Sequence, residues 1–369
     1  MLNSNRIQHF DVLRGFAVLG ILIMNMPDFA FPEWFNGNPF LFEGKGVNLN
    51  SWKFNFIFLE GKMRGILSIL FGASILLISS KKDEEFGISP RAAYYRRMLW
   101  LVFIMLFTSY FFLCFTTILY EYAVSGMLLY FLRNLKPIYL IGLAVIILSV
   151  TSLIEGSTFW ESKKIRNNYT QALSNMEKGI KTKEDRMAIN EWNNNRKDFI
   201  KGIKEATDEV LKEMKSAHSG YTTIFPTVAI MISSGLYEDL MGGIFETLAT
   251  VLLGMGLFKT KFLKGELPLK YYLIPAIVFL LAGTWIGYVR CNIAIKADND
   301  FDGIFLDERN FSLHHSEQFH RLLMIGGYIS LFIFFVKKSA FVFFIKPLSM
   351  IGKMAISNYI FEKANILSP

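Results

Sequence analysis

The sequence predicts an all-α fold, a polytopic bundle of membrane-spanning helices. Of the 369 residues, 52% are hydrophobic and only 19% are charged, below the roughly 25% charged residues of soluble domains. The mean hydropathy is +0.34. Apolar runs of membrane length recur along the chain, and a spanning helix needs about 20 such residues. We expect about nine spans plus one re-entrant segment, with a helical extramembrane insert.

Seven single runs are long enough, or nearly so, to cross a bilayer: 12–30, 52–80, 137–154, 240–258, 270–290, 321–336 and 339–366. Another run, 98–133, has no internal proline. As one helix it would be about 54 Å long, well beyond the bilayer core. We therefore expect a hairpin of two spans that turns near Thr116 and Thr117.

The net charge of +8 does not indicate a nucleic-acid partner, because lysine and arginine lie in short clusters between apolar runs rather than on one polar face. Short cytoplasmic loops carry the excess of these residues. The clusters at 81–97 and 133–136 then place the N-terminus in the cytoplasm. If 221–237 crossed, the lysines of 259–270 would lie outside, so we expect this segment to be re-entrant or interfacial.

The charged residues concentrate in 155–220, which holds 24 of the 70 in the chain. We expect three parts: a five-span membrane half over 1–154, a polar helical extracytoplasmic insert over 155–220, and a second membrane half over 221–369. The insert shows amphipathic helical spacing over 198–216. It is either a solvated cap on the bundle or a lid over a substrate.

Polar and ionisable groups within spans usually face the bundle interior, a partner or a water-filled cavity. Arg14 and Asn25 are eleven residues apart, which is three helical turns, and therefore share one face. The structural alternative is an arginine that extends to the membrane surface and an asparagine that packs between helices.

Three charges within five residues interrupt the next apolar run. Glu60 and Arg64 are four residues apart, so on one helix they share a face and can pair. Lys62 points elsewhere and needs a partner or an anion. We expect a basic pocket for a phosphate-bearing ligand, with a purely structural ion pair as the alternative.

Weaker candidates are Glu121, Glu246 and Arg290, which lie in or beside spans. His320 directly precedes a span on the expected outer side, where a general base for an external hydroxyl could lie. The alternative is a solvated interfacial histidine.

We expect no bound cofactor or metal, because the chain contains no glycine-rich phosphate loop, nucleophile elbow or metal-ligand pattern. Its two cysteines, Cys114 and Cys291, exclude a disulfide scaffold. They either meet near the outer span ends or are two buried thiols.

Five motifs in order resemble the bacterial YeiB-like family of inner-membrane proteins, which is similar to transmembrane acyltransferases such as heparan-α-glucosaminide N-acetyltransferase. They are DVLRGFAVLGILIMN, GKMRGILSILFGAS, RRMLWLVFIMLF with ILYEYAVSGMLL, LATVLLGMGLFK, and IGKMAISNYIFEK. The resemblance spans about residues 6–365 without the insert. It implies acyl transfer from a cytoplasmic acyl-thioester donor, such as acyl-coenzyme A, to an extracytoplasmic acceptor.

Carried over by position, the family's motif residues are Arg14, Asn25, Gly61, Lys62, Arg64, Phe71, Gly72, Asn358 and Tyr359. The chain departs from the family where a histidine, a Gly-Asp pair and an acyl-accepting histidine are expected. It has Ser109, the pair Thr116 and Thr117, and Asn36 at these places. It also stops before the family's last span.

The leading hypothesis is a transmembrane acyltransferase in which Arg14, Lys62 and Arg64 bind the anionic part of the donor. Asn25, Glu60 and His320 are then its catalytic or positioning groups. Rival hypotheses are a transporter or exporter of a small anionic or lipid-linked substrate, and a non-catalytic membrane protein. The expected partners are membrane lipid and a small-molecule or glycan acceptor.

Overall fold

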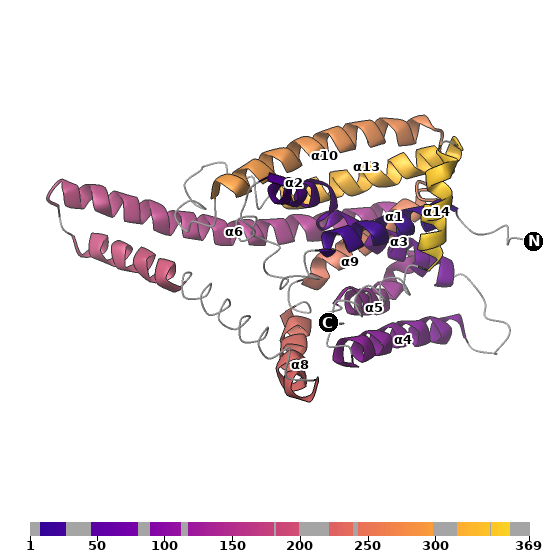
Figure 1. Cartoon of the computed structure of the whole chain (residues 1–369), viewed down its shortest axis with the longest axis horizontal. Helices are drawn as coiled ribbons and strands as arrows, with labels where there is room; N and C mark the ends of the chain where they lie inside the picture. The colour runs from indigo at the N-terminus through magenta and orange to yellow at the C-terminus, as the bar shows by residue number, and fades with distance from the viewer. Residues whose placement is uncertain are drawn as a thin grey trace, which may run out of the picture.

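The computed structural model describes residues 8–26, 46–79, 89–111, 117–180, 182–198, 221–238, 243–297, 316–339 and 341–354. Within these ranges every regular element is a helix and no strand is present, which confirms the all-α prediction. Figure 1 shows long helices lying side by side.

The helices follow one another along the chain as α1 (Gln8–Met24), α2 (Gly46–Phe54), the π-helical turn η4 (Asn55–Leu59), α3 (Lys62–Ser79), α4 (Pro90–Phe111), α5 (Thr117–Leu129), the 3-10 turn η5 (Tyr130–Asn134), α6 (Pro137–Glu177), a helix over 183–198, α8 (Tyr221–Glu238), α9 (Ile244–Lys259), α10 (Lys270–Ala297), α13 (Glu317–Lys337) and α14 (Val342–Lys353).

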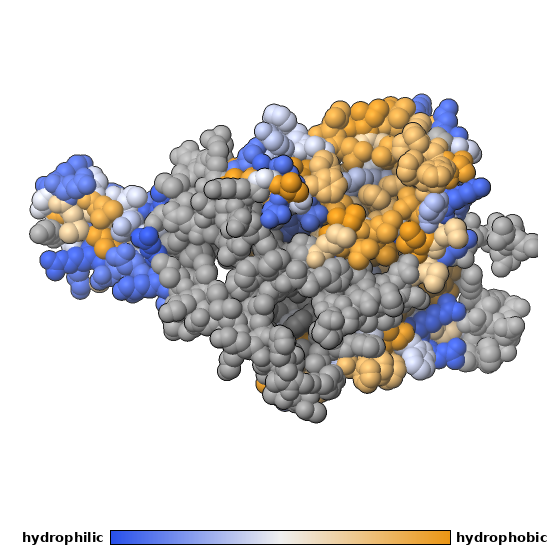
Figure 2. Space-filling view, viewed as in Figure 1, coloured by the Kyte–Doolittle hydropathy of each residue, from blue (hydrophilic) through white to orange (hydrophobic). Residues whose placement is uncertain are grey.

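Within the described ranges, four helical stretches are long and apolar enough to cross a membrane: Gly46–Ser79, Pro137–Ile154, Lys270–Ile295 and Glu317–Lys337. They coincide with four of the expected spans. Large apolar side chains are exposed on α10, including Leu281 and Trp285. Figure 2 shows hydrophobic surface over the region where Figure 1 draws α10, α13 and α14. Such a surface fits lipid better than water, and the chain is therefore a membrane protein.

The run 98–133 is a helical hairpin, as predicted. The Tyr94 hydroxyl near the start of α4 donates to the Gly126 carbonyl near the end of α5 (2.9 Å). The Tyr95 hydroxyl donates to the Met127 carbonyl (3.1 Å). The two helices are therefore antiparallel. Thr116 lies outside the described residues, and α5 begins at Thr117.

The apolar span that starts at Pro137 continues without a break into the polar insert. Helix α6 has 41 residues, about 61 Å at the helical rise, and extends beyond the rest of the bundle (Figure 1). The chain then reverses into the helix 183–198, where hydrogen bonds from Thr182 and Asn175 lower the pKa of Asp185. The insert is helical over 155–177 and 183–198. The amphipathic segment expected over 198–216 falls almost entirely outside the described residues, as does Cys114.

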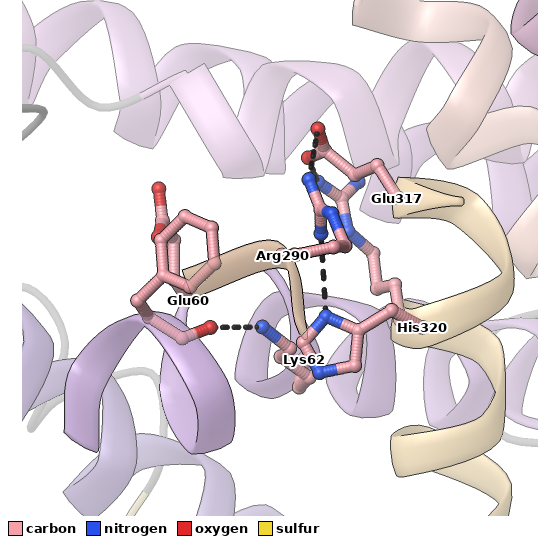
Figure 3. A pocket seen from close by; sticks show the side chains of 7 residues that line it. Glu60, Lys62, Arg290, Glu317 and His320 are labelled. Atoms are coloured by element: carbon pink, nitrogen blue, oxygen red, sulfur yellow. Dashed lines mark hydrogen bonds and ion pairs between the residues drawn. The ribbon is translucent and has the colours of Figure 1, made fainter. Parts of the chain in front are cut away.

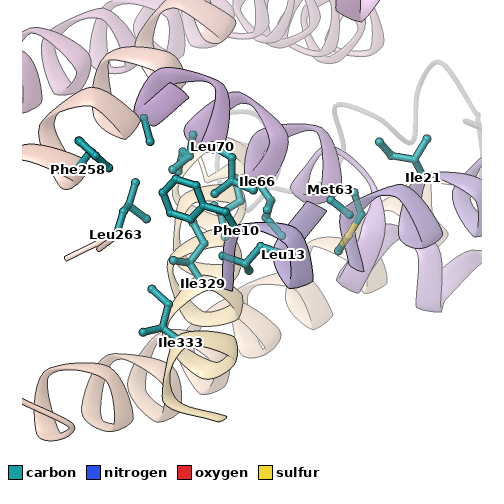
Figure 4. Packing of buried hydrophobic residues seen from close by; sticks show 14 of the residues in the cluster. Phe10, Leu13, Ile21, Met63, Ile66, Leu70, Phe258, Leu263, Ile329 and Ile333 are labelled. Carbon is teal, nitrogen blue, oxygen red and sulfur yellow. The ribbon is translucent and has the colours of Figure 1, made fainter. Parts of the chain in front are cut away.

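Helix α3 lies at the centre of the apolar core. Its Ile66 and Leu70 pack with Leu13 of α1, Phe258 of α9 and Ile329 of α13 (Figure 4). Helices α3 and α9 approach closely because each has a glycine at the crossing. A Cβ on Gly254 would collide with the Ile69 carbonyl, and one on Gly72 would collide with the Val251 carbonyl. Small residues allow such close approach between membrane helices.

Several loops meet at one end of the bundle, which we call the lysine end and define by His9, residues 135–136, 259–267 and Lys337. The Lys259 ammonium donates to the Leu135 carbonyl (2.6 Å). The Lys337 ammonium donates to the Leu267 carbonyl (2.9 Å). A ring nitrogen of His9 lies 2.6 Å from the Leu263 carbonyl oxygen. The start of α1 and the loops that follow η5, α9 and α13 therefore lie together.

The ambiguous segment 221–237 forms one helix, α8, with Pro226 inside it. Figure 1 draws α8 across the direction of α4 and α5. Its Ser233 hydroxyl lies 2.9 Å from the Tyr110 hydroxyl of α4.

The close crossing of α3 and α9 predicts that Gly254→Val destabilises the protein. The added side chain would force the two backbones apart, at a cost of about 2 kcal/mol. Thermal unfolding of the purified protein in lipid nanodiscs measures the effect. The matched control is Gly142→Val on α6, because a Cβ at Gly142 would meet nothing within 4 Å. Equal stability of the two variants would contradict this packing.

Candidate functional site

The apolar run that carries Glu60, Lys62 and Arg64 is not one continuous helix. Helix α2 passes into the π-helical turn η4, and α3 starts anew at Lys62. Between them Gly61 has a φ of +72°, a conformation that glycine adopts without steric cost. The expectation that Glu60 and Arg64 share a helical face is therefore wrong.

Arg64 instead joins α3 to two other helices. Its guanidinium lies 3.8 Å from the carboxylate of Glu121 on α5. That carboxylate also accepts a hydrogen bond from Thr247 of α9. The Tyr122 hydroxyl donates to the Arg64 carbonyl (3.2 Å). Arg64 thus belongs to a partly buried cross-link among three helices.

The break in the span forms one wall of a cavity of about 60 Å³. Helices α10 and α13 supply the other walls (Figure 3). The lining residues are Phe56, Glu60, Lys62, Arg290, Glu317, His320 and Arg321. We call this the charged pocket. It brings together three of the six predicted site residues, Glu60, Lys62 and His320.

Lys62 and Glu60 both lie on the wall formed by the break in the span, but they differ in exposure. The Lys62 side chain is buried, and its ammonium donates to the Phe56 carbonyl (2.6 Å) and lies 5.9 Å from the Phe56 ring centre. Glu60 remains exposed to the pocket. Because an ammonium has three donors, the bond to Phe56 leaves donors for a further group.

The opposite wall is an ion-pair network. One Glu317 oxygen lies 3.0 Å from Arg290 and the other lies 2.8 Å from Arg321. Arg321 also pairs with Glu246 of α9. The network therefore ties α10, α13 and α9 together around the pocket.

His320 is fully buried, so the alternative of a solvated histidine is wrong. Its Nδ1 lies 3.3 Å from Arg290, and its Nε2 lies 3.1 Å from the Ile57 carbonyl oxygen. Arginine can only donate, so Nδ1 accepts and Nε2 carries the hydrogen that binds Ile57. A Cβ on Gly287 would lie 2.5 Å from Nε2. These contacts fix the orientation of the ring.

The other two predicted residues, Arg14 and Asn25, do not line the charged pocket. Arg14 lies 3.5 Å from Asp11 and donates to the Ser74 hydroxyl (3.1 Å), toward the lysine end. Asn25 is buried just beyond the end of α1, at the end of the helix opposite the lysine end.

Three helices place the pocket at the same depth. Helix α3 has 18 residues and extends about 27 Å from Lys62. Arg290 is 20 residues from Lys270 along α10, and Glu317 is 20 residues from Lys337 along α13, about 30 Å in each case. The apolar core of a bilayer has a similar thickness. The pocket therefore lies near the end of the bundle opposite the lysine end.

The sequence reading missed Glu317 and Arg321 and gave little weight to Arg290. One signal was present, because Glu317, His320 and Arg321 occupy positions i, i+3 and i+4, which share a helical face. Among the described residues, no group of three or more His, Cys, Asp or Glu side chains could hold a metal ion.

Comparison with known proteins gives a partial match. The profile of a family described as "Protein of unknown function (DUF418)" matches residues 257–367. A Bacillus subtilis (strain 168) protein named "Uncharacterized protein YxaH" is 29% identical over 142 residues, which are 37% of this chain and 35% of that relative. The chain thus matches about a third of the relative's length. No solved structure matches it. The profile covers Arg290, Glu317, His320 and Arg321, but not Glu60 or Lys62.

The geometry of the break predicts that Gly61→Ala is destabilising. A Cβ there would lie 2.5 Å from the Arg321 Nε, in addition to the strain of positive φ. We expect a loss of roughly 2 kcal/mol, measured by thermal unfolding. Gly46→Ala is the matched control, because Gly46 has a φ of +60° with nothing within 4 Å of a Cβ. A similar loss in both variants would mean that Arg321 does not pack over Gly61.

Proposed function

We propose that the protein is a transmembrane acyltransferase and that the charged pocket is where its acceptor reacts. The observation that carries the proposal is Glu60, an exposed carboxylate beside the buried ammonium of Lys62 in a cavity between membrane helices. A carboxylate can accept a proton, and an ammonium can stabilise developing negative charge. Acyl transfer needs both groups.

In this mechanism Glu60 accepts the proton of an acceptor hydroxyl or amine as that atom attacks the thioester carbonyl carbon. Lys62 donates a hydrogen bond to the oxygen that becomes negative. The carbon–sulfur bond then breaks, the acyl group stays on the acceptor, and the departing thiolate takes up the proton that Glu60 accepted, which regenerates the carboxylate. Acyl-coenzyme A is the proposed co-substrate, and a small molecule or glycan is the proposed acceptor.

His320 acts through Arg290 in this proposal. Its ring bonds Arg290 on one side and the Ile57 carbonyl on the other. It therefore positions the arginine against η4 rather than accepting the acceptor's proton. Asn25, which lies outside the pocket lining, receives no catalytic role.

The donor is proposed to enter from the lysine end. Arg14 contacts Ser74, twelve residues along α3 from Lys62, or roughly 18 Å. Arg14 is partly exposed and suits the anionic part of an acyl donor. Arg64 is engaged by Glu121 and is assigned no part in donor binding.

We also propose nine spans, with the N-terminus and the lysine end on the cytoplasmic side of a bacterial inner membrane. The contact between Lys259 and Leu135 supports this topology. The chain leaves the lysine end along α6 and returns to it along α9. The number of membrane crossings from the start of α6 to the end of α9 must therefore be even. Helix α8 then lies at the interface and does not cross.

This topology predicts which side of the membrane an introduced cysteine faces. In intact cells, a membrane-impermeant maleimide should label Lys163→Cys in the insert and leave Lys261→Cys unlabelled. Lys261 is exposed and Lys163 is partly exposed, so after permeabilisation both should react. Ready labelling of Lys261→Cys in intact cells would place the lysine end outside and overturn the topology.

The reaction predicts that Glu60→Gln lowers acyl transfer at least about 100-fold, because glutamine cannot accept the proton. Full-length protein in nanodiscs is supplied with acetyl-coenzyme A and a cell-envelope extract, and the release of free thiol is measured. The matched control, Glu177→Gln at the exposed end of α6, should keep the wild-type rate. Thiol release by wild type no faster than in protein-free nanodiscs would sink the proposal.

The broken span favours one second candidate, export of a small anionic or lipid-linked substrate. Discontinuous membrane helices commonly form the binding sites of transporters, and α3 begins anew at the charged pocket. Export predicts movement of an intact substrate with no release of thiol.

A further inference from the structure

Glu317 is held in the manner of a bound oxyanion. Each of its two carboxylate oxygens is bonded by a different arginine, Arg290 at 3.0 Å and Arg321 at 2.8 Å. Guanidinium groups bind the carboxylates and phosphates of ligands with the same donors and at the same distances. Figure 3 shows the Glu317 carboxylate beside the Arg290 guanidinium on one side of the pocket.

The two arginines are fixed more firmly than the glutamate. Their side chains are only 8% and 11% exposed, whereas that of Glu317 is 39% exposed. Arg290 is also held by His320 and lies 5.4 Å from the Phe56 ring centre. Arg321 is also held by Glu246. Rotation of the Glu317 side chain would therefore expose two guanidinium groups that keep their places.

The charge balance of the pocket favours an anion once Glu317 has turned away. Among the described residues that line or adjoin the pocket, Lys62, Arg290 and Arg321 then face two carboxylates, Glu60 in the lining and Glu246 behind Arg321. The cavity of about 60 Å³ holds a small charged group but not an entire substrate. Burial makes the attraction stronger than it would be in bulk water.

We propose that Arg290 and Arg321 form an oxyanion site for the carboxylate or phosphate of the substrate, and that Glu317 occupies it until the substrate binds. The glutamate then excludes weakly bound anions, and a ligand enters by replacing its carboxylate. The proposal assigns a ligand class, small oxyanions, to the charged pocket. That the anion belongs to a substrate rests on the proposed acyl transfer. Anion binding itself is measured without any acyl donor.

Removing the Glu317 carboxylate, which competes with the ligand for the two arginines, should tighten anion binding. In nanodiscs, thermal unfolding of the full chain is followed while inorganic phosphate, or in a second arm acetate, replaces chloride at constant ionic strength. A ligand that binds the folded state raises the unfolding temperature. We expect Glu317→Gln to reach half of its maximal shift at an anion concentration at least about tenfold lower than wild type, because its site is already vacant. Preference for one anion identifies the carboxylate or the phosphate class.

Two further variants make the test decisive. Glu266→Gln is the matched control, because Glu266 pairs with Lys261 (3.6 Å) at the lysine end and should leave anion binding unchanged. Glu317→Asp keeps the charge on a shorter side chain and should give an intermediate gain even if Glu317→Gln folds poorly. The proposal falls if neither Glu317 variant binds phosphate or acetate more tightly than wild type, or if Glu266→Gln gains equally.

The outcome is separable from that of the acyl-transfer assay. Tighter anion binding without thiol release would support the oxyanion site and contradict the proposed acyl transfer. Thiol release with unchanged anion binding would support the acyl transfer and contradict the proposal that Glu317 competes with the ligand.

Discussion

The structure around the charged pocket depends on one contact, the passage of the Arg321 side chain over Gly61. A side chain at that glycine would collide with the guanidinium, so the break between η4 and α3 creates the space that Arg321 fills. Arg321 then reaches Glu246 and Glu317, which ties α13 to α9 at the level of the break. Gly61 also has a positive φ. The same residue must therefore lack a Cβ, to leave space for Arg321, and adopt a backbone conformation that favours glycine.

Burial of so many charges is tolerated only because they compensate one another. An isolated ion between membrane helices costs several kcal/mol, and its partners reduce that cost only when the geometry is good. Arg290 and Arg321 share the Glu317 carboxylate, and His320 offers Arg290 a neutral acceptor. A ligand anion that enters such a network replaces an existing partner rather than meeting a bare charge. The affinity of the ligand anion then depends on how much more strongly it binds the arginines than the Glu317 carboxylate does.

Features governed by local pattern could be predicted from the sequence, whereas those governed by long-range contacts could not. The all-helical fold and the 98–133 hairpin follow from apolar periodicity and length. The break at Gly61 leaves no such signal, because a glycine within an apolar run is compatible with a continuous helix. The partner of Arg64 lies 57 residues away at Glu121, and that of His320 lies 263 residues away at Ile57. Helical spacing cannot identify such partners, so only three of the six predicted residues meet.

The pocket joins two distant parts of the chain, and its charged residues are divided between them. The exposed carboxylate and one cation, Glu60 and Lys62, come from the N-terminal half. The two arginines, with Glu317 and His320, come from the region that matches the DUF418 profile. His320 bonds η4 directly, and Arg321 passes over Gly61, so the wall with the proposed anion site is held against the wall with the proposed proton acceptor. A shift of α13 relative to α3 would change both contacts at once. The proposed binding of an anion would therefore be mechanically linked to the position of Glu60.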